Sequence, residues 1–186
     1  MMTTVCGQNS DDTAKSYVPI IYGDRLKPFL DSLKIQIFVD TTKFKQTDLI
    51  FTTLGRRNVK PFSPLFIING AYIYKLDIVS GSQVVEFAKE ILDDKKIKSI
   101  TYIDSTKASE HFGQNAWQGV ILLTMFDKAR FNPKIAGLTL RKNKSGDNFT
   151  QRKNGEILIR DWIRLTNKTS SGVSAGFPAN KSSELK

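Results

Sequence analysis

The chain has 186 residues, of which 40 % are hydrophobic and 25 % charged, and its formal net charge is +10 at pH 7. This composition excludes a fully disordered chain and predicts one domain with tails. The single cysteine, Cys6, excludes an internal disulfide, and the single histidine, His111, excludes a histidine-cluster metal site. No apolar run approaches the roughly 20 residues of a membrane helix. We therefore expect no metal, no cofactor and no transmembrane segment.

The positive charge is concentrated in the last third of the chain. Residues 1–126 hold 15 Lys/Arg and 13 Asp/Glu, whereas residues 127–186 hold 13 Lys/Arg and 5 Asp/Glu. Such a segment is typical of a solvated arm, and it also suits an acidic partner or lipid headgroups. Because it has few aromatic residues for stacking on bases, we expect no specific binding of nucleic acid. A cytoplasmic protein that binds nucleic acid through this third remains the alternative function.

The N-terminal residues 1–16 are expected to form a tail. Residues 1–8 are mostly apolar or small, and residues 9–12 are polar, which resembles the last part of a secretory signal peptide. One interpretation is therefore a truncated signal-peptide remnant, and the other is a loose N-terminus.

Proline positions restrict the first elements expected along the chain. The apolar run 17–22 contains Pro19, which allows an edge strand at best. Residues 24–33 have apolar side chains at helical spacing, but Pro28 restricts the predicted helix to one or two turns.

Alternating residue types predict a strand over 35–39, and a β-rich run predicts another over 49–54. Residues 55–58 contain Gly and Asn around two arginines and are predicted to form a turn. Arg56 and Arg57 in such a turn are ordinarily solvated, and the functional alternative is that they hold an anion.

The clearest pattern lies in residues 61–126, where we expect the core. Two strand-like runs, 64–68 and 71–74, flank Asn69 and Gly70. This dipeptide is the strongest two-residue hairpin signal, because both turn positions need a positive φ. The residues expected to be buried here are Ile67, Ile100, Val120 and Leu122.

The elements expected next are a helix over 84–92, a strand over 97–103, a short helix over 106–112 and a strand over 120–126. Asp104 or Ser105 is predicted to cap the short helix, and Gly113 to close it. A right-handed crossover would lay the two strands of this β-α-β unit parallel to each other.

The chain changes character after residue 126. Residues 127–165 are predicted to form a basic, β-rich extension in which 138–140 and 157–159 pair as a hairpin, and residues 166–186 a disordered tail. The arms of this extension are expected to dock on the core, because their apolar side chains need burial and an isolated hairpin is marginal in water. The alternative is that they stay mobile until an acidic partner surface or anionic lipid headgroups cover them, which the basic side chains beside the apolar ones would suit. These candidate partner-binding residues are Arg160, Trp162 and Arg164.

No group of residues has the spacing of a catalytic site. His111 has no second imidazole for a metal, and the only cysteine lies in the N-terminal tail. Gly113 and Gly119 match no phosphate-binding loop. We therefore predict that the protein is not an enzyme.

Four segments follow a family pattern: the strand–turn–strand 64–73, the strand 97–103, the pair Phe112-Gly113 and the run 115–124, which contains Gly119 before an apolar strand. Together they resemble the plug domain of TonB-dependent outer-membrane receptors, over about a third of the chain. The motif positions are Asn69, Gly70, Phe112, Gly113 and Gly119. The sequence departs from the family pattern at Asn69, Asp104 and Asn115.

The resemblance implies a free-standing, non-enzymatic plug-like domain over 17–126, in the periplasm or associated with the outer membrane of a Gram-negative bacterium. It would act by binding an envelope protein, an outer-membrane component or a solute. The expected fold is α+β, a small mixed sheet with a β-hairpin and a β-α-β unit, and short helices packed on it. Trp117 is expected to be a lid on the core, and its alternative role is an exposed partner contact.

Overall fold

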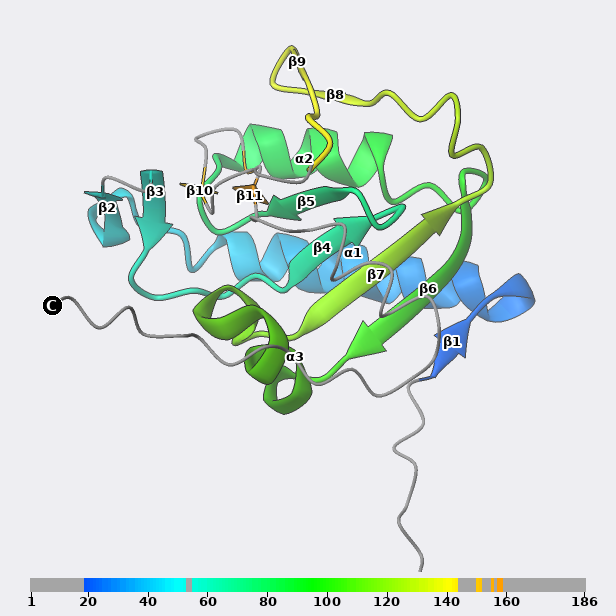
Figure 1. Ribbon diagram of the computed structural model, residues 1–186, viewed down its shortest axis with the longest axis horizontal. Helices are drawn as coiled ribbons and strands as arrows, with labels where there is room; N and C mark the ends of the chain where they lie inside the picture. Colours follow the sequence, from blue (N-terminus) through cyan, green and yellow to red (C-terminus); the bar gives the residue numbers. More distant parts are fainter. Residues whose placement is uncertain (1–18, 53–54, 144–149, 152–154, 156, 159–186) are drawn as a thin grey trace, which may run out of the picture.

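The computed structural model describes residues 19–52, 55–143, 150–151, 155 and 157–158. Its centre is a five-stranded mixed sheet in the order β1-β6-β7-β4-β5 (Figure 1). Together with the short helices packed on it, this sheet confirms the predicted α+β class. Its strands are β1 (Ile20–Ile21), β4 (Leu65–Ile68), β5 (Tyr72–Lys75), β6 (Ile97–Ile103) and β7 (Val120–Met125).

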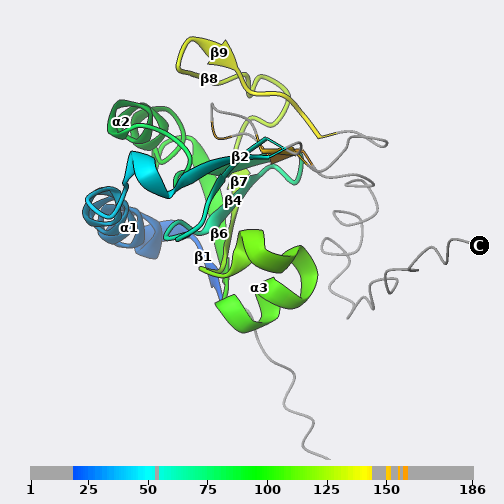
Figure 2. The same cartoon turned by 90° about the vertical axis from the view of Figure 1, so that its left-hand side faces the viewer.

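Helices cover both faces of the central sheet. Figure 2 shows α1 (Leu26–Thr41) and α2 (Gly81–Glu90) on one face and α3 (Ser105–Phe112) on the other. The larger apolar cluster lies under α1 and α2, where the ring of Phe87 stacks on that of Tyr74 and meets that of Phe66 edge to face. The smaller cluster lies under α3 and includes Leu65, Ile67, Ala108, Ala116 and Val120.

The hairpin signal is confirmed. Residues 69–71 join β4 to the antiparallel β5, and Asn69 and Gly70 have φ values of 53° and 64°, the positive values that this dipeptide favours at the centre of a turn. The cap signals of the short helix are confirmed as well. The Asp104 side chain accepts a hydrogen bond from the backbone N–H of Lys107, and Gly113 ends the helix with a φ of 60°.

The predicted parallel pairing of residues 97–103 with 120–126 is wrong. β6 and β7 are antiparallel, with Ile103 opposite Val120 and Ile97 opposite Met125. A parallel crossover must return along the whole of β6, which is seven residues or about 23 Å long. Residues 104–119 are long enough to do so, but η3 packs back against α3, and Gly119, with a φ of 85°, starts β7 beside the end of β6. β7 runs parallel to β4.

The predicted strand over 35–39 is wrong, because α1 continues through it to Thr41. Pro28 is the third residue of α1, where a backbone N–H has no partner within the helix, so the proline does not limit its length. Ile37 extends the buried stripe formed by Leu26 and Leu30 by two more turns, and this packing outweighs the local alternation.

A second sheet has the strand order β11-β10-β3-β2. The turn predicted at residues 55–58 is wrong, because these residues form β3 and pair antiparallel with β2. Arg56 lies 5.3 Å from the centre of the Phe51 ring, and Arg57 donates a hydrogen bond to Gln114, so neither side chain is simply solvated. The strands are β2 (Leu49–Thr52), β3 (Gly55–Asn58), β10 (Thr150–Gln151) and β11 (Ile157–Leu158).

The predicted hairpin between residues 138–140 and 157–159 is also wrong. β9 (Leu138–Thr139) pairs with β8 (Lys134–Ile135), and β11 pairs with β10. The partner of β9 is nearer in sequence, and the β8–β9 hairpin places Ile135 in the core beside α2. Each of these short strands therefore pairs with a strand that is close to it in the sequence.

Three short 3₁₀ helices complete the described structure: η1 (Gly23–Arg25), η2 (Gln46–Asp48) and η3 (Gly113–Ala116). No helix in the described ranges is long and apolar enough to cross a membrane. The N-terminal tail, the C-terminal tail and the candidate residues Arg160, Trp162 and Arg164 lie outside the described residues.

Candidate functional site

A pocket of about 790 Å³ opens beside α1, between this helix, the loop before β4 and strands β6 and β7. Its volume is within the range of small-molecule binding sites. Its apolar surface comes mainly from Phe29, Leu33, Phe62, Pro64, Tyr102 and Ile121.

The rim of the pocket carries charges. Asp40 pairs with Lys43 at 2.6 Å and also accepts a hydrogen bond from Gln36 at 3.0 Å. Asp48 lies 3.6 Å from Lys60. Both carboxylates are mostly buried, with side chains 11 % and 13 % exposed, so each is held beside its lysine. The result is a pocket with an apolar interior and fixed acidic groups at its rim.

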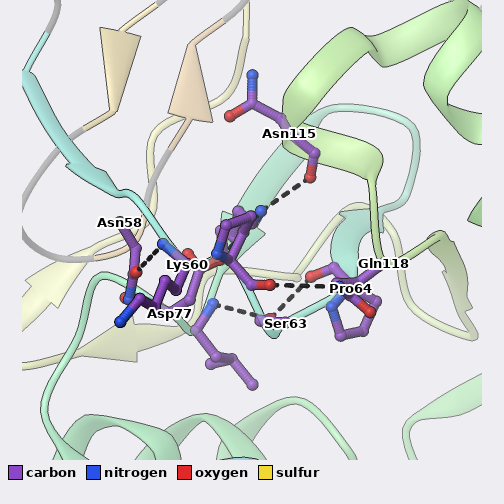
Figure 3. A network of polar contacts seen from close by, with 10 residues as sticks. Asn58, Lys60, Ser63, Pro64, Asp77, Asn115 and Gln118 are labelled. Carbon is purple, nitrogen blue, oxygen red and sulfur yellow. Dashed lines mark hydrogen bonds and ion pairs between the residues drawn. The ribbon is translucent and has the colours of Figure 1, made fainter. Parts of the chain in front are cut away.

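The loop of residues 59–64, which forms one wall of the pocket, is held in place by hydrogen bonds (Figure 3). The side chain of Asn58 donates to the main-chain oxygen of Asp77 at 2.8 Å and accepts from the N–H of Lys60. Ser63 Oγ accepts from the N–H of Leu76 at 3.1 Å and donates to the oxygen of Pro64. The loop is therefore bonded at both ends to the chain segment that follows β5.

A buried ion pair lies at the centre of this anchor. Lys75 Nζ is 3.0 Å from Asp77 Oδ2, and their side chains are 3 % and 2 % exposed. The same ammonium donates to the main-chain oxygen of Asn115 at 3.0 Å, which ties η3 to β5 (Figure 3). Burial raises the pKa of Asp77 above its usual range, and the charge of Lys75 opposes this rise. Lys75 thus links η3, which precedes the pocket residue Gln118, to the segment that anchors the loop 59–64.

Gly119 links η3 to the pocket at a point where no side chain fits. Its φ is +85°, and a Cβ atom there would lie 2.8 Å from the oxygen of Ile103 and 3.1 Å from the hydroxyl of Tyr102. The absence of a side chain lets the backbone pass close to Tyr102, which lines the pocket. The neighbouring Gln118 also lines the pocket and donates to the oxygen of Pro61 at 3.2 Å.

The structure distributes the sequence-predicted site residues widely. Gly119 borders the pocket, Phe112 and Gly113 lie at the end of α3, and Asn69 and Gly70 form the β4–β5 turn. The preferred interpretation of Trp117 as a lid on the core is wrong, because its side chain is 48 % exposed. Its role as a partner contact stays a prediction.

Sequence reasoning missed the buried pair and the pocket. Lys75 and Asp77 follow a predicted strand, but nothing in their spacing indicates that both are buried. The residues of the pocket come from five separate segments, and only the fold brings them together. Within the described ranges, no group of three or more His, Cys, Asp or Glu side chains is placed to hold a metal ion.

Comparisons with protein-family models, with curated proteins and with solved structures find no match to this chain.

Proposed function

We propose that the protein is a non-enzymatic, plug-like binding domain of the cell envelope that holds a small solute in the pocket beside α1. The observation that carries the proposal is the pocket itself, with its volume of about 790 Å³, apolar interior and polar rim. Pockets of this size and character are the default binding sites of small molecules.

The resemblance of residues 64–126 to receptor plug domains supports the envelope location and the binding role. This stretch supplies four of the five strands of the central sheet, β4 to β7, in one continuous segment. Four of its motif positions, Asn69, Gly70, Gly113 and Gly119, have a positive φ. The motif residues therefore have backbone roles that their residue types suit, and the binding role is assigned to the pocket.

The exposed Trp117 supports a contact with an envelope protein or an outer-membrane component beside the pocket. It follows η3 directly and precedes Gln118, which belongs to the pocket rim. A partner that covers Trp117 would therefore lie next to the bound solute.

Filling the pocket is expected to abolish binding. Gln36 is an exposed residue of α1 that lines the pocket, so Gln36→Phe adds an aromatic ring to the cavity without changing the core. The neutral dye N-phenyl-1-naphthylamine, whose fluorescence rises in apolar sites, is the probe. We expect the variant to bind the dye at least tenfold more weakly than the parent.

The matched control is Ser32→Phe, which adds the same ring to an exposed position of α1 that does not line the pocket. It should bind the dye like the parent. Failure of the parent to bind the dye, or equal binding by both variants, would show that the pocket is not a binding site.

Binding to nucleic acid is expected to be unspecific. The excess of basic residues in 127–186 attracts phosphate without reading bases. Fluorescence anisotropy with DNA and RNA duplexes of several sequences should show equal affinities that fall steeply between about 50 and 200 mM salt. Tight binding of one sequence at physiological salt would instead favour the cytoplasmic, nucleic-acid-binding alternative.

A further inference from the structure

We infer that the solute is a small amphipathic anion, an apolar body with one acidic group, and that Lys45 pairs with this group. The inference rests on the proposed function, because it names the chemical class of the molecule that the pocket beside α1 would bind.

The interior of the pocket selects the apolar body. Three aromatic side chains, Phe29, Phe62 and Tyr102, line it together with prolines and with Ile121 at the sheet. Ile121 and Phe62 are almost completely buried, so the pocket reaches down to the apolar core. A ligand that fills this space removes apolar surface from water, which favours binding by about 25 cal/mol per Å².

The rim selects the acidic group. It holds three lysines and two aspartates, and each aspartate already has a lysine of its own: Asp40 has Lys43, and Asp48 has Lys60. Lys45 takes part in no ion pair among the described residues, and its side chain is exposed at the rim. One positive charge is therefore left for a ligand.

The paired aspartates disfavour the opposite kind of ligand. A cation would have to compete with Lys43 for Asp40 or with Lys60 for Asp48, and it would be repelled by the unpaired Lys45. A neutral ligand would gain the apolar contacts but no attraction from Lys45. A ligand whose anionic group lies at Lys45 and whose apolar part lies against Phe62 gains both the attraction of the lysine and the apolar contacts.

Two dyes with the same aromatic skeleton test the inference. One is 8-anilinonaphthalene-1-sulfonate, which carries an acidic group, and the other is N-phenyl-1-naphthylamine, which lacks it. We expect Lys45→Gln to weaken binding of the sulfonate about threefold, the size expected for one solvated ion pair, and to leave the neutral dye unchanged. Raising the salt concentration should weaken only the sulfonate, and only in the parent.

The matched control is Lys95→Gln, which removes an exposed lysine outside the pocket. It should change neither affinity, whereas Gln36→Phe should weaken both dyes. Equal effects of Lys45→Gln and Lys95→Gln on the sulfonate would overturn the inference, while binding of the neutral dye would still support the pocket. If the parent binds neither dye, the proposed function fails as well.

Discussion

Replacing Asp77 with Asn is expected to lower the free energy of unfolding by about 3–5 kcal/mol, the usual cost of breaking a buried ion pair from one side. The variant leaves the ammonium of Lys75 buried without the carboxylate of Asp77, and hydrogen-bonded to the main-chain oxygen of Asn115. Lys75→Met is expected to be destabilising as well, because it leaves the carboxyl group of Asp77 buried without its cation. Urea unfolding followed by circular dichroism gives both values.

The double variant Lys75→Met/Asp77→Asn is the control for this prediction. It removes both charges, so neither an ammonium nor a carboxylate is left buried without its partner. We therefore expect it to be more stable than either single variant. If the two single effects simply add in the double variant, the two side chains do not interact and the assignment is wrong.

The same pair predicts a pH dependence with a definite sign. Because burial raises the pKa of Asp77, the folded state takes up a proton at a higher pH than the unfolded state. Between these two pKa values the folded state binds more protons, so the contribution of this group to stability rises as the pH falls. In Lys75→Met the attraction of the cation is lost and the pKa of Asp77 rises further. The deficit of this variant relative to the parent in urea unfolding should therefore shrink as the pH is lowered.

Replacing Leu123 with Ala is expected to cost about 2–5 kcal/mol of unfolding free energy. Leu123 is 1 % exposed and lies in β7 on the face covered by α1 and α2, where the larger apolar cluster packs. Truncation leaves a cavity that its neighbours, held in the sheet and two helices, fill only in part. Thermal and urea unfolding of the variant measure the loss.

Leu122 offers a matched comparison in the same strand. It was expected to be buried, but the structure shows it only partly buried, on the opposite face beside α3. Leu122→Ala removes the same atoms and should cost clearly less than Leu123→Ala, because water already reaches part of the side chain. Equal losses for the two variants would contradict the placement of the main core on the α1 and α2 face.

Short-range physics explains what the sequence by itself determined. The Asn69-Gly70 turn, the cap at Asp104 and the end of α3 at Gly113 each depend on two to four neighbouring residues. The apolar stripe of α2 and the short apolar runs that form β4 and most of β5 likewise need no distant partner to be recognised. Most strands and helices of residues 61–126, and with them the α+β class, could therefore be predicted.

Contacts between residues far apart in the sequence decided the structure of 35–39 and 55–58 and the direction of β7 relative to β6. Burial of Ile37 under the sheet makes 35–39 part of a helix, and pairing with β2 turns residues 55–58 into a strand. The packing of η3 against α3 brings the start of β7 beside the end of β6, which makes the two strands antiparallel. In each case the burial or pairing gained outweighs a local preference of at most about 1 kcal/mol per residue.

The candidate site belongs to the same category. Lys75 and Asp77 become a buried pair because the loop before β4 and η3 close over them, and these segments lie about 12 and 40 residues away. The pocket combines one face of α1 with four other segments of the chain. Asp40 and Asp48 contact other lysines there, which leaves Lys45 without an ion pair among the described residues. Residue types alone do not show which charged side chains form ion pairs, since an ion pair depends on the distance between the two side chains.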